Sequence, residues 1–223
     1  MSPNIVANDS HGDIINAEEK NDAQKSAVGI VLGKTTDSSL IKNTLMAKLN
    51  LIKHFSGAFS QQVFDTDGNQ LQTGTGRLSI SKPNKVRWET QTPDESLIVS
   101  DGKTLWVYDP FIEQASAYDL QNSIANTPIL LLTSQSAELW QNYNVNQANE
   151  NTFVISSKDS NSQVKTLELS FDSKSEKLSG FIILDATGQL SKISLQNVDY
   201  KNKPNEQSFT FILPDGVHLD DQR

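Results

Sequence analysis

Apolar residues along most of the chain recur at every second position, in short runs that turn-forming residues separate. This alternation is typical of strands that bury one face, and dipeptides such as Asp67-Gly68 and Asp101-Gly102 favour tight hairpins. We predict about eleven strands from residue 55 onward, a number that indicates an antiparallel sandwich or barrel. They lie at about 55–63, 70–81, three positions between 82 and 110, 113–118, 143–147, 152–157, 165–171, 178–184, 191–200 and 207–213.

The clearest strand pattern lies between residues 82 and 110. Near its end, Leu105 and Val107 point to one face of a strand, while Trp106 and Tyr108 point to the other. Both faces of this strand are therefore apolar, and we expect other parts of the chain to cover each of them.

Two regions have a helical pattern instead. Asp37 or Ser38 can cap a helix, and its apolar stripe consists of Ile41, Leu45, Leu49 and Ile52. Thr127 is a good N-cap and Pro128 suits a first helical position, so a second helix is expected over 129–132, with a further turn from Ala137 to Trp140. Four consecutive apolar residues cannot share one side of a helix. This second helix is therefore buried all round or has an apolar side that another group covers.

The distribution of large side chains predicts a hollow molecule. Many strands carry only two or three large apolar residues, whereas the helix at 129–132 carries four in a row. A wall of eleven strands encloses more space than such side chains fill, and large barrels commonly hold ligands. We expect a mainly β (α+β) fold, an incomplete antiparallel barrel whose apolar hollow is covered by a helical lid. The alternative for Trp88, Trp106 and Trp140 is an ordinary place in a solid core.

Charge and composition exclude several classes of protein. The 223 residues carry 19 basic and 27 acidic side chains, for a net charge of −8, and show no basic cluster that would indicate a nucleic-acid partner. No apolar run is long enough to span a membrane, and the chain has no cysteine. Residues 1–36 are polar and predict a flexible extension, and residues 37–223 predict a single domain. The extension lacks the pattern of a secretory signal.

The sequence shows no constellation for catalysis or metal binding. Its three histidines, His11, His54 and His218, are far apart, and no Gly-x-Ser-x-Gly motif is present. Asp65 begins a segment that is similar to a calcium-binding loop, but Gly76 stands where the loop requires glutamate. We predict no catalytic residues, no metal and no cofactor.

Several sequence motifs occur in a fixed order: Lys82-Pro83-Asn84 with Trp88, Pro93-Asp94-Glu95-Ser96, Val99-Ser100-Asp101-Gly102-Lys103-Thr104-Leu105-Trp106, Asn126-Thr127-Pro128, and Pro214-Asp215-Gly216-Val217 with Asp220-Asp221-Gln222. In these motifs the chain, over about residues 38–223, resembles the LolA family of periplasmic lipoprotein carriers. The resemblance implies a half-barrel that shelters the acyl chains of lipoproteins. It also implies an inner-membrane ATP-driven (ABC) exporter as donor, an outer-membrane receptor similar to LolB as acceptor, and a location in the periplasm.

The resemblance also carries over particular residues. It implies that Val86 and Trp88 line the cavity wall and that Ile129 and Leu132 line the lid. The arginine that latches the lid in the family is replaced by Lys82, a point charge in place of a planar fork of donors. For Lys82 the alternative is a solvated residue at a strand end. For the whole chain the alternatives are a lipid-sensing regulatory domain of the same architecture and, less favoured, a hydrolase.

Overall fold

The computed structural model describes residues 38–123 and 127–223, which belong to one compact unit. The predicted extension at residues 1–36 lies outside the described residues. Among the described residues, no helix has both the length and the apolar character needed to cross a membrane.

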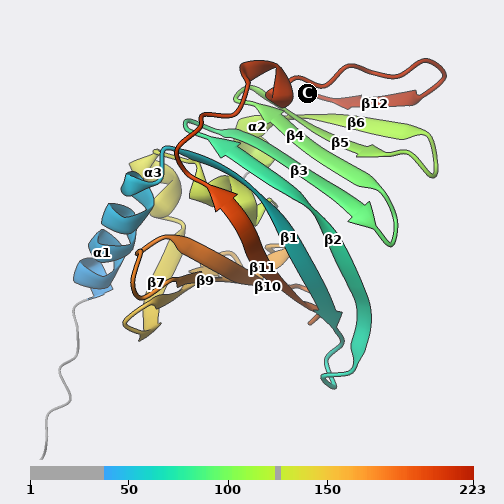
Figure 1. Cartoon of the computed structure of the whole chain (residues 1–223). Helices are drawn as coiled ribbons and strands as arrows, with labels where there is room; N and C mark the ends of the chain where they lie inside the picture. Colours follow the sequence, from blue (N-terminus) through green and yellow to red (C-terminus); the bar gives the residue numbers. More distant parts are fainter. Residues whose placement is uncertain (1–37, 124–126) are drawn as a thin grey trace, which may run out of the picture. The chain divides into compact units, whose positions relative to one another are not determined.

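Twelve strands in the described part of the chain form a single open sheet, in the order β12-β6-β5-β4-β3-β2-β1-β11-β10-β9-β8-β7. Neighbouring strands are antiparallel except for β12, which runs parallel to β6. The strands are β1 (His54–Phe64), β2 (Gln70–Ser81), β3 (Lys85–Thr92), β4 (Ser96–Asp101), β5 (Thr104–Asp109), β6 (Gln114–Asp119), β7 (Tyr143–Asn149), β8 (Thr152–Ser157), β9 (Val164–Phe171), β10 (Leu178–Asp185), β11 (Leu190–Asp199) and β12 (His218–Gln222). The sheet is strongly curved but not closed (Figure 1). The predicted incomplete antiparallel barrel is confirmed.

The helical segments are α1 (Ser38–Leu51), α2 (Leu120–Ser123), α3 (Ala137–Trp140) and the 3-10 turns η2 (Pro128–Leu132) and η3 (Glu206–Phe209). The predicted apolar stripe of α1 is confirmed, because Leu45, Leu49 and Ile52 are buried and α1 packs against β7. The predicted helix at 129–132 is a 3-10 turn. Thr127 occupies the N-cap position and Pro128 begins the turn, as predicted, but the Thr127 side chain makes no capping hydrogen bond.

The prediction also failed near the C-terminus. The segment 207–213 is not a strand: Asn205 accepts a hydrogen bond from the Gln207 N–H at 3.0 Å and starts η3 there. β12 was not predicted, because its sequence is mostly polar and lacks a repeat of two. Its backbone pairing with β6 forms it instead.

Most buried side chains lie inside the curve of the sheet, where strands from both halves of the sheet, α1 and η2 contribute to one apolar cluster. At its centre the Trp88 ring lies 5.1 Å from Phe59 and 5.6 Å from Phe181, measured between centroids. Phe59 packs directly over Gly76, where a Cβ atom would lie 2.5 Å from the ring. Glycine at this position therefore allows the aromatic centre to form.

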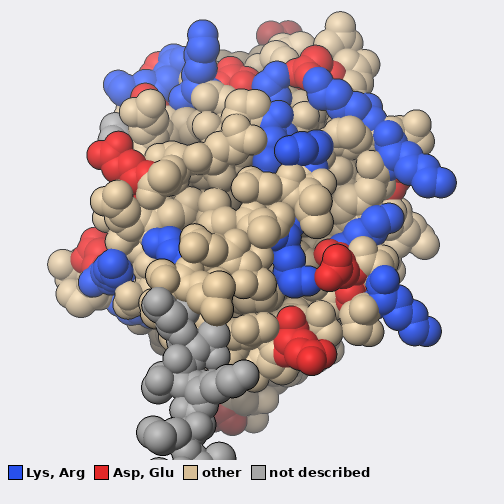
Figure 2. Space-filling model, turned by 90° about the vertical axis from the view of Figure 1, so that its left-hand side faces the viewer, with Lys and Arg blue, Asp and Glu red and all other residues tan. Residues whose placement is uncertain are grey.

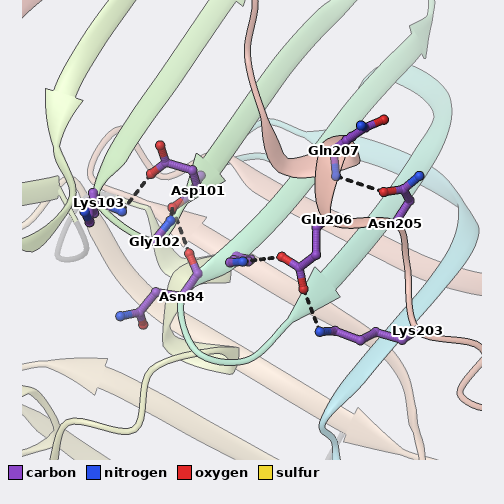
Figure 3. A network of polar contacts seen from close by, with 10 residues as sticks. Asn84, Asp101, Gly102, Lys103, Lys203, Asn205, Glu206 and Gln207 are labelled. Carbon is purple, nitrogen blue, oxygen red and sulfur yellow. Dashed lines mark hydrogen bonds and ion pairs between the residues drawn. The ribbon is translucent and has the colours of Figure 1, made fainter.

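The C-terminal segment covers the outer face of β3 to β5, as the two-sided pattern of β5 predicted. Phe211 stacks on Trp106 and also contacts Tyr108, with ring centroids 5.1 and 5.6 Å apart. Glu206 anchors the start of this segment by accepting hydrogen bonds from Lys85 and Lys203 (Figure 3). These two lysines lower the pKa of the Glu206 carboxyl to about 2.

Candidate functional site

The wall of the candidate site is the inner face of β3. Val86 lies between Ile80 of β2 and Ser100 of β4 in the strand register, and its side chain is fully buried. Trp88 lies two residues further along the same face, with 9% of its surface exposed. The period of two places both side chains on the face that the lid covers.

The lid, which we define as residues 128–140, closes over this wall. Ile129 and Leu132 are each 2% exposed, and the two leucines between them are equally buried. The 129–132 stretch of the lid is thus buried all round, the first of the two possibilities that its sequence left open. All four side chains belong to the same apolar cluster as Val86 and Trp88.

In this closed form the interior is filled by the protein's own side chains. The sequence predicted an apolar hollow, but the lid side chains and the aromatic centre occupy the space between the wall and the opposite strands. The physical reason is that an open apolar hollow would leave large areas of hydrocarbon in contact with water. Among the described residues, the space predicted to be hollow is therefore filled by these buried side chains.

Few polar contacts between described residues join the lid to the rest of the chain. Asn84 of the β2–β3 turn donates its backbone N–H to the Thr133 carbonyl at 3.4 Å, which is long for such a bond. The Lys42 ammonium of α1 donates to the Trp140 carbonyl, and directly after the lid Lys158 donates to the Gln141 carbonyl at 2.8 Å. Two of these three contacts come from lysine side chains, so the lid is attached mainly by packing and by flexible donors.

Two buried polar atoms, one in the lid and one in the neighbouring β2–β3 turn, have no hydrogen-bond partner among the described residues: Trp140 Nε1 and Asn84 Oδ1. A buried donor or acceptor without a partner costs about 1–3 kcal/mol. The Trp140 indole N–H lies on the lid itself, so its missing partner disfavours the buried position of this side chain. Sequence reasoning missed this feature, since it follows only from the packing around each side chain.

Lys82 follows β2, and its side chain donates a hydrogen bond to the end of α1. Its Nζ donates to the Leu49 carbonyl in the last turn of α1 at 2.6 Å, and its backbone N–H donates to the Lys53 carbonyl at 2.9 Å. Burial first, and then the nearby Lys53 charge, lower the pKa of Lys82 to about 8. A cation suits the negative end of a helix, so this lysine joins α1 to the β2–β3 turn.

The face toward which α1 lies carries many basic side chains. Figure 2 shows lysine and arginine around its margin with acidic groups between them, although the whole chain has a net charge of −8. One of the ion pairs of α1 joins Lys48 to Glu176 in the β9–β10 turn, at 3.2 Å. Such exposed pairs contribute little to stability.

Comparison with known proteins places these features in a family. The family model described as "Outer membrane lipoprotein carrier protein LolA" matches residues 50–212. A protein of Aliivibrio salmonicida named outer-membrane lipoprotein carrier protein is 42% identical over 179 residues, which is 80% of this chain and 89% of that protein. A protein of the same name from Aeromonas salmonicida is 38% identical over 181 residues, covering 81% and 89% of the two chains.

Solved structures are more distant. A LolA superfamily protein from Nitrosomonas europaea is 12% identical, with a TM-score of 0.44 over 76% of this chain and 97% of the other. A similarity of this size supports no statement about function.

Proposed function

Because the chain belongs to the LolA family of outer-membrane lipoprotein carrier proteins, we propose that it carries lipoproteins through the periplasm with their acyl chains between the curved sheet and the lid. One observation carries the proposal: a continuous apolar interior is closed by a segment that few polar contacts attach. Acyl chains offer the same chemistry as the lid side chains that fill this space. Cargo would therefore enter by displacing the lid.

The energetics of the cargo constrain how it is released. Burying one methylene group is worth about 0.8 kcal/mol, so several long acyl chains represent tens of kcal/mol of apolar surface. Release into water is too unfavourable to occur at a useful rate. We therefore infer direct transfer, from an ATP-driven exporter of the inner membrane to the carrier and from the carrier to an outer-membrane receptor similar to LolB.

In this proposal each predicted site residue has one role. Val86 and Trp88 provide the wall against which an acyl chain lies, and Ile129 and Leu132 hold that place in the empty protein. Lys82 latches the cover indirectly, because it holds the end of α1 while Lys42 of the same helix holds the lid.

A lid that can be locked tests the proposal. Asn84→Cys and Thr133→Cys would place two thiols at the backbone contact between the lid and the β2–β3 turn, within reach of a disulfide. The natural chain has no cysteine, so this pair would be the only one. An apolar fluorescent dye should bind the reduced variant near one-to-one and be displaced by a synthetic tri-acylated lipopeptide.

The oxidised variant should lose dye binding, and reductant should restore it. The single variant Asn84→Cys is the matched control and should bind dye under both conditions. Equal dye binding by the oxidised and reduced double variant would place the dye outside the lid, and the carrier proposal would then be wrong.

A further inference from the structure

The turn between β5 and β6 presents two large apolar side chains to solvent. Phe111 is 89% exposed and Ile112 is 59% exposed. The turn is well fixed, because the Asp109 carboxylate accepts the Phe111 N–H at 2.9 Å and the Ile112 N–H at 3.4 Å. On its other side, His218 at the start of β12 donates its N–H to the Glu113 carbonyl at 2.8 Å. A fixed, fully exposed phenylalanine is costly in water and is typical of an anchor residue at an interface.

A cleft of about 430 Å³ lies beside this turn on the outer face of the sheet. Tyr108 and Pro110 line it next to the turn, and Glu95 lines it from the β3–β4 turn. The positive charge of Arg87 in the cleft is already paired, because Arg87 donates two hydrogen bonds to one carboxylate oxygen of Glu89, at 3.1 and 3.0 Å. The cleft is therefore suited to receive a cation near Glu95.

Charge indicates what kind of surface fits here. The turns at 93–95, 109–113 and 214–217 contain five acidic residues and no lysine or arginine. An anionic membrane surface would be repelled by this end of the molecule, and so would a second copy of the same turns. A basic protein surface would be attracted.

We propose that the β5–β6 turn and the adjacent cleft form a docking surface for a partner protein that presents an apolar pocket bordered by lysine or arginine side chains. Phe111 enters the pocket, and one basic side chain of the partner enters the cleft toward Glu95. This surface lies on the outer face of the sheet, opposite the covered interior. If this docking surface is shown not to exist, the proposed carrier function is unaffected.

Photocrosslinking in the cells that naturally produce the protein tests this surface. The full-length chain would carry benzoylphenylalanine in place of Phe111, with the same probe in place of Leu71 as control, because Leu71 is an apolar residue of β2 that is 55% exposed. Two further proteins would carry the probe at position 111. One would add the double charge reversal Asp94→Lys and Glu95→Lys, and the other would add the control Glu150→Lys in the β7–β8 turn. All three acidic side chains are exposed, so the folds should be unaffected.

We expect one protein product from position 111 and none of the same mass from position 71. Its crosslinked peptide should map to a pocket bordered by basic residues. The double charge reversal should lower its yield about tenfold, as for loss of an important interface contact, and Glu150→Lys should leave it unchanged. The proposal is overturned by the absence of a product, by a phospholipid or a dimer of this chain as the product, or by a protein product that the charge reversal does not affect.

Discussion

Lys82 connects α1 to the sheet, and the free energy of that connection can be measured. Lys82→Met keeps the length of the side chain but removes its donors. The Leu49 carbonyl would still accept the Ile52 N–H at 3.1 Å, so it would not be left without a partner. A hydrogen bond to a charged group contributes about 1.5–3 kcal/mol net, and relief of a buried charge offsets part of this. We expect a net loss of about 1 kcal/mol, which raises the population with α1 detached about fivefold.

The pH dependence separates this role from a purely steric one. Lys82 has a pKa of about 8 when attached and would return toward 10.5 when α1 detaches and the ammonium is hydrated. Between these values the detached form binds more protons, so detachment becomes less favourable as pH rises from about 8 to about 10.5. In this pH range the attached Lys82 is a neutral amine, which still donates to the Leu49 carbonyl but no longer buries a charge. Lys82→Met should lose this dependence, and Lys82→Arg should lose it too because arginine stays protonated.

Spin labels on cysteines in place of Leu40 and Glu150 would report the distance between α1 and the β7–β8 turn, both label sites being exposed. Pulsed electron resonance on the wild-type background and on the two Lys82 variants would give the detached fraction at pH 7 and pH 10. Lys82→Arg should be detached least at pH 7, because its fork of donors can hold a second carbonyl. Identical distance distributions in all three proteins at both pH values would refute the latch, and packing alone would then hold α1.

The parts of the fold that sequence alone could predict are those where burial decides the pattern. The strands that alternate around Val86 and Trp88 and the stripe of α1 were predictable, because each puts apolar side chains on one face. β12 was not, since a polar edge strand owes its form to backbone pairing with β6. The 3-10 turn at Glu206 likewise depends on the cap from Asn205 and on the ion pair with Lys85, which lies far away in the sequence.

The candidate site divides in the same way. Sequence and family resemblance identified the residues of the wall and lid, and the structure places them in one apolar cluster. Neither the sequence nor the resemblance could predict whether this cluster surrounds a hollow or fills the interior, because both arrangements require the same apolar residues. The partner of Lys82 was equally out of reach, because motif spacing places the lysine beside the β2–β3 turn but does not determine which helix end approaches it.

Two substitutions test how the interior is built. Gly76→Ala should lower the melting temperature by several degrees, because the new Cβ would lie 2.1 Å from the Glu89 carbonyl oxygen and 2.5 Å from the Phe59 ring. The control Thr73→Ala, on the exposed part of β2, should change the melting temperature little. Val86→Glu places a carboxylate at a fully buried position, where it must be hydrated or lose its charge. Opening the weakly attached lid hydrates it at lower cost than unfolding the sheet. We therefore expect a larger population with the lid open and weaker binding of apolar dye, with a melting temperature within a few degrees of the wild type. The control Val86→Ala introduces no polar group and should leave the lid closed. If Val86→Glu instead unfolds the whole domain in calorimetry and circular dichroism, the wall at β3 belongs to a core that does not open.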